Sequence, residues 1–456
     1  MRVFNTFESA SLNIRFNYND TQVSERQFVN DINSVVAKIP PSPKKAAAVL
    51  INTNSYDFAV NLFALAQKGW TVVLPPNGQP KTINSLLKQT PYYLGDSDLI
   101  ADTSATFENI ATLPSAPNYT PLHNIKWPTE GNLVFYTSGS AGKAKPIVKS
   151  WRILYKEIKT LTSTFALNAA PVFFASVSHQ HIYGLLFRLL WPLSCNCIID
   201  TDLLHYPEHI TTKLKTVKYA VLISSPAQLK RLHHDNVLVE QRARLQWIFS
   251  SGGPLLKEDA AILYTQLNKP ITQVFGSTET GGIAYRQVVS TEIASHWQPF
   301  LGITLSNSAQ QRLVLNSPLV EQRNYLLDDR GTLFENGQFE LLGRFDRIIK
   351  IEEKRLSLDE LEQHLCLSQW VQEAKIIMLS GQRLRLGAVI VLTSQGQDYL
   401  NTNGKLATNA LLKTHTLSRF ESICTPKKWR FIAHLPYNTQ AKLNLNALES
   451  LFAKAD

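Results

Sequence analysis

The sequence predicts an α/β fold: a large N-terminal domain of mixed α/β layers with a β-rich subdomain, and a small, mobile α+β C-terminal domain. Residues 46–75 have the order strand, helix, strand that is typical of a parallel sheet. The same alternation returns between residues 170 and 275. Short alternating runs and turns from about residue 299 to residue 343 instead indicate antiparallel strands.

The individual elements follow from apolar runs that end in turn-forming residues. In the N-terminal domain we expect strands at residues 46–51, 70–75, 133–135, 170–177, 219–223, 247–249 and 271–275, with a helix between the first two and helices at 184–193 and 226–234. Farther along, we expect a strand at 312–315, a turn at 328–331, a helix at 358–366 and a strand at 386–392. The domains are therefore placed at residues 1–343 and 347–456, with the boundary near 344–346.

The composition is that of a globular protein with more than one domain. Of the 456 residues, 44% are hydrophobic and 18% are charged. The formal net charge of +10 favours acidic partners, such as nucleotides, acidic carrier proteins or nucleic acid. Because the basic residues are scattered, without a dense run that includes aromatic residues, nucleic-acid binding is the less favoured alternative.

No targeting or membrane segment is expected. The sequence does not open on a secretion signal, and its most apolar region, residues 182–199, is interrupted by Arg188, Ser194 and Asn196. We therefore expect a cytoplasmic protein with reduced thiols. The cysteines have no spacing that is typical of a disulfide framework or a metal site; they are Cys195, Cys197, Cys366 and Cys424.

The most informative stretch is Tyr136–Lys145, which follows a predicted strand and combines three kinds of anion-binding group. Glycines bring backbone N–H groups close to a ligand, hydroxyls donate hydrogen bonds and lysines add positive charge. A Walker-type phosphate loop is excluded, because only two residues separate Gly139 from Gly142 and Ala144 stands at the position of the magnesium-binding hydroxyl. The anion-binding residues are Thr137, Ser138, Gly139, Ser140, Gly142, Lys143 and Lys145.

This stretch resembles the phosphate loop of the adenylate-forming superfamily, which includes acyl-CoA synthetases, aryl-CoA ligases and peptide-synthetase adenylation domains. That loop usually reads T-S-G-[ST]-T-G-x-P-K-G, and this chain departs from it at Ala141, Ala144 and Pro146. A weaker resemblance is to the stand-alone acyl or aryl ligases of aryl-polyene-type pathways. The resemblance implies ATP and Mg²⁺ as cofactors and a nucleotide-binding role for Thr137, Ser138, Gly139, Ser140, Gly142 and Lys145.

Two further segments match the superfamily in the expected order. The segment that begins at Phe275 resembles [YW]-G-x-T-E. In it Phe275 and Gly276 would bind the nucleotide, with the aromatic ring against adenine, while Thr278 would donate to a phosphate and Glu279 would ligate Mg²⁺. Gly253 belongs to a looser match with the adenine and acyl pockets. The alternatives are an exposed loop carboxylate for Glu279 and a plain turn at Gly253.

Three residues near the domain boundary also match, and the resemblance implies a hinge near 344–346. Arg344 and Asp346 lie in a segment that resembles the hinge motif G-R-x-D-x-x-I-K, and Asp329 falls on the family's ribose-binding carboxylate. Asp329 would accept from both ribose hydroxyls, Arg344 would stay charged beside phosphate and Asp346 would be the pivot. The alternative for Arg344 and Asp346 is a surface salt bridge. Glu353 replaces a glycine that lies by the tunnel through which the family's thiol enters, which argues against free CoA as the acceptor.

The remaining matches concern the acid and the transition state. Lys442 lies in a segment that resembles L-P-x-T-x-x-G-K-[IL] and falls on the catalytic lysine, which neutralises charge at the carboxylate and the α-phosphate. His181 and Gly184 match an H-x-x-G segment beside the acyl pocket, and Tyr183 would help to wall that pocket. The alternatives are a metal pair, if His179 and His181 share one face of a strand, and core histidines.

The ordered motifs predict a ligase in which a carboxylate attacks the α-phosphate of Mg·ATP, releases pyrophosphate and forms an acyl-adenylate. We expect an aromatic or medium-chain acid as the substrate, and a phosphopantetheine thiol of an acyl carrier protein or CoA as the acceptor. The alternatives are a free-CoA ligase and a catalytically degenerate nucleotide-binding module. The departures that favour the degenerate module are Ala141, Pro146, Asp328 and Ala441.

Replacement of Lys442 by alanine is expected to abolish most acid-dependent ATP–pyrophosphate exchange, because the charge that develops in the transition state would lose its neutralising cation. The exchange of labelled pyrophosphate into ATP, measured over a panel of aromatic and aliphatic acids, checks this expectation. Exchange that is unchanged in the variant would refute the role of this lysine.

Overall fold

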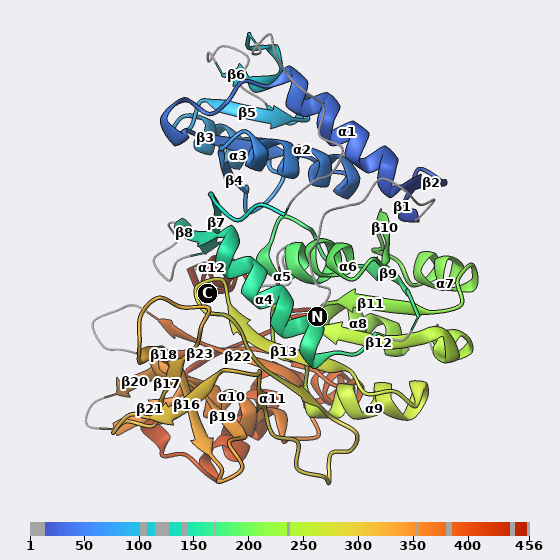
Figure 1. Ribbon diagram of the computed structural model, residues 1–456. Coiled ribbons are helices and arrows are strands. Elements are labelled where there is room, and N and C mark those ends of the chain that lie inside the picture. Colours follow the sequence, from blue (N-terminus) through green and yellow to red (C-terminus); the bar gives the residue numbers. More distant parts are fainter. Residues whose placement is uncertain are drawn as a thin grey trace. The chain divides into compact units, whose positions relative to one another are not determined.

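The computed structural model describes residues 14–100, 107–114, 127–138, 144–167, 169–234, 238–351, 354–379, 385–437 and 443–453 (Figure 1). The chain divides into two compact units, each with its own core. The second unit begins before residues 344–346, where the hinge is predicted. The hinge and the predicted domain limits stay predictions. The units are Met1–Ile303 with Ser317–Arg323, and Thr304–Asn316 with Asn324–Asp456.

The larger sheet of the first unit is mostly parallel. Its order is β15 (Gln298–Pro299), β14 (Gly281–Gln287), β13 (Thr272–Ser277), β12 (Leu245–Ser250), β11 (Ala220–Ser224), β9 (Val172–Ala175), β10 (Ile198–Leu203), β1 (Ile14–Tyr18) and β2 (Thr21–Ser24). The strands from β13 to β1 pair in parallel, while β14 returns antiparallel to β13. Strands β9 and β11 are buried along their whole length, as is typical of parallel strands that are covered on both faces.

The second sheet of this unit ends in the hairpin that contains the predicted phosphate loop. Its order is β6 (Glu108–Asn109), β5 (Tyr92–Gly95), β3 (Ala47–Ile51), β4 (Thr71–Val73), β7 (Asn132–Ser138) and β8 (Ala144–Ser150). Strands β3, β4, β5 and β7 are parallel, whereas β8 runs antiparallel to β7. The loop therefore joins the two strands at one edge of the sheet, with Thr137 opposite Lys145.

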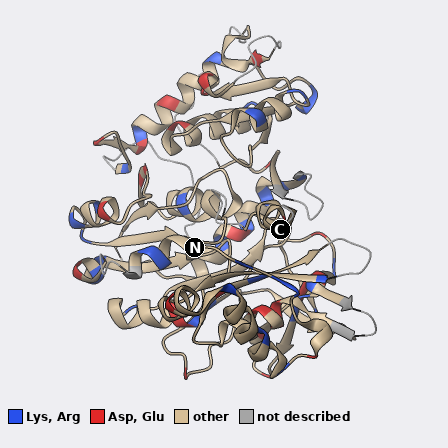
Figure 2. Cartoon of the chain, turned by 180° about the vertical axis from the view of Figure 1, so that it is seen from behind, with Lys and Arg blue, Asp and Glu red and all other residues tan. Residues whose placement is uncertain are grey.

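Short polar side chains cap three of the helices in the first unit. The α-helices among the described residues of this unit are α1 (Glu25–Lys38), α2 (Ser55–Gln67), α3 (Pro80–Leu87), α4 (Trp151–Thr164), α5 (Ile182–Gly184), α6 (Trp191–Ser194), α7 (Pro207–Lys215), α8 (Pro226–His234) and α9 (Lys257–Leu267). Ser24, Asn54 and Ser150 accept backbone N–H groups at the starts of α1, α2 and α4. Basic and acidic residues are interspersed over the helices (Figure 2).

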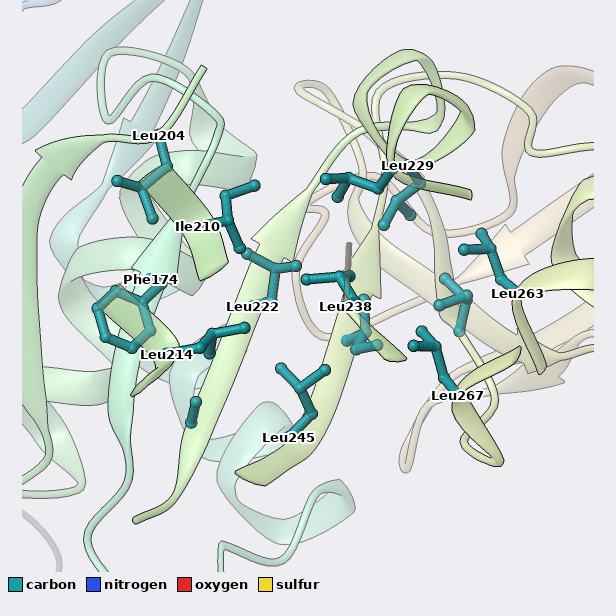
Figure 3. Close-up of a cluster of buried hydrophobic side chains, with 14 of the residues drawn as sticks. Phe174, Leu204, Ile210, Leu214, Leu222, Leu229, Leu238, Leu245, Leu263 and Leu267 are labelled. Atoms are coloured by element: carbon teal, nitrogen blue, oxygen red, sulfur yellow. The ribbon is translucent and has the colours of Figure 1, made fainter. Parts of the chain in front are cut away.

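A cluster of buried apolar side chains packs helices α7, α8 and α9 against the larger sheet (Figure 3). Leu222 from β11 and Leu245 from β12 belong to this cluster, together with Leu214 of α7, Leu229 of α8 and Leu263 of α9. Each of these leucines is almost completely buried, which stabilises the fold by roughly 1.5–3 kcal/mol per side chain. The packing fixes the strand ends from which the site loops emerge.

The described residues of the second unit form three sheets. Their orders are β16 (Thr304–Asn307), β17 (Arg312–Asn316), β18 (Tyr325–Leu333), β19 (Phe339–Arg344); β20 (Ile348–Ile351), β21 (Lys354–Ser357); and β22 (Val371–Leu379), β23 (Arg385–Leu392), β24 (Lys428–Phe431). One apolar cluster packs the last sheet with α10 (Leu358–Cys366) and α11 (Ser394–Leu417). Another packs it with α12 (Leu445–Ala453). This sheet is therefore buried between helices.

Most predicted elements are confirmed, some to the residue. The helices predicted at 226–234 and 358–366 have those limits as α8 and α10. The turn predicted at 328–331 is wrong, because these polar residues lie inside β18. A register shift between Arg330 and Gly331 accommodates them, and a Cβ at Gly331 would lie 2.8 Å from the carbonyl oxygen of Glu340.

Within the described ranges, every helix is too short or too polar to cross a bilayer.

Replacement of Gly396 by alanine is expected to destabilise the protein, although alanine normally favours a helix by about 1 kcal/mol. Gly396 lies in the first turn of α11, and an added Cβ would lie 2.2 Å from the carbonyl oxygen of Trp370. We expect a loss of about 1–3 kcal/mol, measured by urea denaturation. Gly78→Ala is the control, since a methyl group there would have open space within 4 Å. Equal or greater stability of Gly396→Ala would contradict the clash.

Candidate functional site

A tight turn at the end of β13 presents Thr278 and Glu279. The Ser277 N–H donates to the Thr280 hydroxyl over 3.1 Å, and the Thr280 N–H donates to the Ser277 hydroxyl over 3.2 Å. Gly276 is required by the close return of the chain, because a Cβ there would lie 2.3 Å from the Gly281 carbonyl oxygen. Ser277 and Thr280 close the turn through these hydrogen bonds, which leaves the side chains of Thr278 and Glu279 at its tip.

The side chains of Thr278 and Glu279 are available to a ligand. Among the described residues, neither the Thr278 hydroxyl nor the Glu279 carboxylate has a hydrogen-bonding partner, and both residues are only partly buried. A carboxylate beside a hydroxyl is a set of hard oxygen donors, which suits Mg²⁺. These donors are therefore of the kind that the sequence predicts for Mg²⁺ at Glu279 and for a phosphate oxygen at Thr278.

The hairpin that contains the predicted phosphate loop lies against this turn. Lys149, near the end of β8, donates from Nζ to the Glu279 carbonyl oxygen over 2.6 Å, and only 3% of its surface is exposed. Burial lowers the pKa of Lys149 below its usual value. Two regions 130 residues apart in the chain are thus in direct contact.

Three of the predicted phosphate-binding residues lie in the strands that flank this loop. Thr137 and Ser138 end β7, opposite Lys145 and Ala144 of β8. Lys145 is exposed. Gly139, Ser140 and Gly142 lie outside the described residues.

A buried carboxylate binds the backbone just after the turn. Glu157 of α4 accepts the Gly282 N–H at Oε1 over 2.6 Å. Burial raises the pKa of Glu157, while the hydrogen bond from Gly282 and the charge of Lys149 oppose that rise. The sequence motifs do not identify Glu157, and Lys149 looks like one of several scattered basic residues. The available signal was a charged residue on the apolar side of an amphipathic helix.

The predicted adenine-side residues lie on neighbouring strand ends. Phe275 of β13 is half-buried, with its ring 5.6 Å from that of Trp297. The Ser251 hydroxyl donates to the Val274 carbonyl oxygen over 2.9 Å, which joins the segment after β12 to β13. Gly253 follows in that segment and is exposed. The structure therefore brings Gly253 and Phe275 to the same edge of the larger sheet.

The predicted acyl-pocket residues follow the end of β9. The Tyr183 hydroxyl donates to the Ser224 carbonyl oxygen over 3.1 Å, and its ring lies 5.0 Å from that of Phe187. Gly184 is buried, and a Cβ there would lie 1.9 Å from the Ser178 carbonyl oxygen. His181 is partly buried and directly precedes α5. The loop therefore folds closely on itself and directs Tyr183 to the end of β11.

The strand geometry assumed for a histidine metal pair is wrong. His179 and His181 lie in a turn, and the described residues contain no group of three or more side chains that could hold a metal ion. His179 is buried against Phe58, with its Nε2 atom 3.1 Å from the Asn52 carbonyl oxygen. Burial lowers the pKa of His179 to about 3, so this residue is a neutral core histidine.

The second unit contains the predicted ribose and hinge residues. Asp329 of β18 lies opposite Arg344 of β19. Burial raises the pKa of Asp329 to about 6, although the nearby Arg344 opposes the rise. The Arg344 guanidinium donates two hydrogen bonds to Asp346, of 2.8 and 2.6 Å, which is the salt bridge considered as the alternative. Glu353 and Lys442 lie outside the described residues.

Comparison with known proteins identifies a family. The family model "AMP-binding enzyme" matches residues 45–338. A D-alanine–D-alanyl carrier protein ligase of Staphylococcus epidermidis is 24% identical over 347 residues, covering 68% of this chain and 69% of that protein. A ligase of the same name from Staphylococcus aureus is also 24% identical, with the same coverage.

Solved structures share the fold. ATP-bound MatB from Rhodopseudomonas palustris superposes with a TM-score of 0.78 at 16% identity, covering 97% of this chain and 96% of that chain. An anthranilate CoA ligase in complex with anthranoyl-AMP superposes with a TM-score of 0.76 at 14% identity, covering 99% and 98% of the two chains. These similarities extend over both units of the chain.

Replacement of Asp329 by asparagine is expected to stabilise the protein above pH 6. The pKa of Asp329 is about 6 in the folded chain, against an ordinary value of 3.8, so the folded state binds this proton more tightly. Stability therefore falls as the pH rises from about 4 to 6 and the carboxylate ionises. The variant avoids this loss, which is on the order of 1 kcal/mol after solvent screening. Urea midpoints at pH 4 and pH 8 check this, and a gain that is equal at both values would contradict it.

Proposed function

The chain belongs to the AMP-binding enzyme family, and we propose that it activates an aromatic or medium-chain carboxylic acid with ATP and transfers it to the phosphopantetheine thiol of an acyl carrier protein. The coarser activity, ATP-dependent formation of an acyl-adenylate by an acid ligase, follows from the family and from ligase relatives. The acid, the acceptor and the site residues are the proposal.

The contact between Lys149 and the backbone of Glu279 is the observation that best supports the proposed site. It brings the strand that leaves the phosphate loop against the turn that presents Thr278 and Glu279. A loop for phosphates beside an uncommitted carboxylate suits a nucleoside triphosphate with its metal ion. Both elements fall within the part of the chain that matches the family model.

The proposed reaction has two steps. A carboxylate oxygen of the acid attacks the α-phosphorus of ATP, the bond to the bridging oxygen breaks and pyrophosphate leaves, which gives the acyl-adenylate. A thiol sulfur then attacks the acyl carbon, AMP leaves and the thiol proton is released. Mg²⁺, held by Glu279, would supply charge neutralisation at the phosphates.

The chain's own groups orient and stabilise the reactants. Residues 137–145 would bind the leaving phosphates, and Asp329 would accept the ribose hydroxyls. Lys442 would neutralise the charge that develops between carboxylate and α-phosphate. Positioning and electrostatic stabilisation supply the acceleration, so the reaction requires no nucleophilic side chain. A swing about Asp346 would admit the thiol.

Three observations support a carrier protein as the acceptor. The relatives at 24% identity are named as carrier protein ligases. The net charge of +10 favours an acidic partner. Glu353 stands where the family usually has glycine beside the thiol tunnel, and its negative charge would repel the phosphates of free CoA. Free CoA remains the alternative acceptor, and a cytoplasmic location stays a prediction.

Aromatic residues near the predicted acyl pocket support an aromatic or medium-chain acid. Tyr183 packs against Phe187, and Phe187 lies 5.2 Å from Phe249 between ring centres. Phe187 and Phe249 are buried in the core, so of these three rings only that of Tyr183 would face the substrate, and an aromatic ring suits an apolar or flat group rather than a charged one. The Tyr183 hydroxyl is bound to Ser224, which keeps its ring in place. Removal of the Tyr183 ring is expected to widen the range of acids that the site accepts.

Replacement of Glu279 by glutamine is expected to lower acid-dependent ATP–pyrophosphate exchange and to raise the Mg²⁺ concentration required for half-maximal exchange about tenfold or more, because the amide is a weaker metal ligand. Glu292→Gln is the matched control, since it makes the same charge change at an exposed residue of the same unit. An unaltered magnesium requirement in Glu279→Gln would remove Glu279 from the metal site.

The same assay separates the alternatives. A degenerate nucleotide-binding module would bind ATP but show no exchange with any acid of the panel. Thioester formation is then compared between free CoA and an acidic carrier protein that bears phosphopantetheine. We expect a higher kcat/KM with the carrier protein, and a higher value with CoA would make the chain a free-CoA ligase.

A further inference from the structure

Two buried charged residues with no role in the reaction described above bind the backbone at Glu279, within the turn, and at Gly282, just after it. We propose that Lys149 and Glu157 are positioning residues, which hold this turn against the phosphate-loop hairpin and thereby set the affinity for Mg·ATP. This inference rests on the proposed function and deepens it, because it concerns how the metal-binding turn is placed. Neither residue is assigned to a catalytic step.

The side chain of Lys149 binds the backbone of the turn. Lys149 is 3% exposed, and its side chain reaches from β8 to the Glu279 carbonyl oxygen, 2.6 Å away. A hydrogen bond from a charged donor in a buried place is stronger than one between neutral groups. The bond leaves the Glu279 carboxylate uncommitted, so Lys149 fixes the residue without occupying its metal-binding group.

Glu157 binds the backbone of Gly282, which follows the turn. The residue is 4% exposed, and its carboxylate accepts the Gly282 N–H over 2.6 Å. The two glycines that follow the turn make room for it: a Cβ at Gly281 would lie 2.8 Å from Oε2, and one at Gly282 would lie 3.3 Å from Oε1. The chain therefore has no side chain at the two places where one would push the carboxylate away.

The two residues come from one continuous segment. Lys149 lies near the end of β8, Ser150 caps α4, and Glu157 follows two turns into that helix. The opposite charges of Lys149 and Glu157 stabilise each other, and each binds a backbone group of the turn. The strand that leaves the phosphate loop, α4 and the turn are thereby joined, so displacement of one displaces the others.

The test compares Lys149→Met and Glu157→Gln with the unaltered chain. Binding of α,β-methylene-ATP is measured by calorimetry as a function of Mg²⁺ concentration, with no acid present. We expect the affinity for the metal–nucleotide complex to fall about ten- to a hundredfold, as is typical when groups that orient a metal ligand are removed. Affinity for the nucleotide without Mg²⁺ is expected to change less than about threefold.

A second readout needs no ligand. Hydrogen–deuterium exchange of a peptide that spans the β13–β14 turn reports its backbone protection directly. Glu157→Gln is expected to expose the Gly282 amide, and Lys149→Met is expected to loosen the turn around Glu279. Lys149→Arg keeps the charge and should restore most of the protection and of the Mg²⁺ dependence. This conservative variant also serves if Lys149→Met does not fold.

Lys213→Met is the control for loss of a partly buried lysine elsewhere in the unit. Lys213 pairs with Asp200 and Asp202, so its removal should lower general stability without a change at the turn. Unchanged protection and Mg²⁺ dependence in Lys149→Met and Glu157→Gln would overturn the inference. A loss that Lys213→Met reproduces would also overturn it, because the effect would then be general destabilisation.

Failure of the proposed function gives a different result. If no acid supports exchange in the unaltered chain, the ligase proposal fails, while the exchange of amide hydrogens still reports whether Lys149 and Glu157 hold the turn. If the unaltered chain is active and the variants keep its Mg²⁺ dependence, only the positioning inference fails.

Discussion

The hydrogen bond from Lys149 Nζ to the Glu279 carbonyl oxygen is the interaction on which the proposed site depends. It joins the strand that leaves the phosphate loop to the turn that presents an uncommitted carboxylate. Burial of Lys149 removes solvation and lowers the pKa of its ammonium group, and the Glu157 and Glu279 carboxylates offset that effect only in part. The site is thus built from segments that are distant in sequence and held by buried charge.

Much of the fold was predictable, because buried parallel strands are runs of apolar residues. The strand Ala220–Ser224 and the helices α8 and α10 follow from such runs and their turn signals. The prediction was wrong where strand pairing, and not the local sequence, determined the structure. The polar residues 328–331 look like a turn on local grounds, yet pairing with both neighbouring strands keeps them within β18.

The candidate site was predictable to the extent that short motifs contain it. The hydroxyl and carboxylate of Thr278 and Glu279 stand out in the sequence, whereas the residues that support them do not. Glu157 is one acidic residue in an ordinary amphipathic helix, and only the packing of α4 reveals its bond to Gly282. His179 is the reverse case, because two neighbouring histidines suggest a metal and the structure buries one beside Phe58.

A crystal structure with Mg²⁺ and α,β-methylene-ATP tests the central claim most directly. We predict that the triphosphate lies between the phosphate-loop hairpin and the β13–β14 turn, with the metal at the Glu279 carboxylate. A nucleotide bound elsewhere, or a metal that Glu279 does not contact, would contradict it.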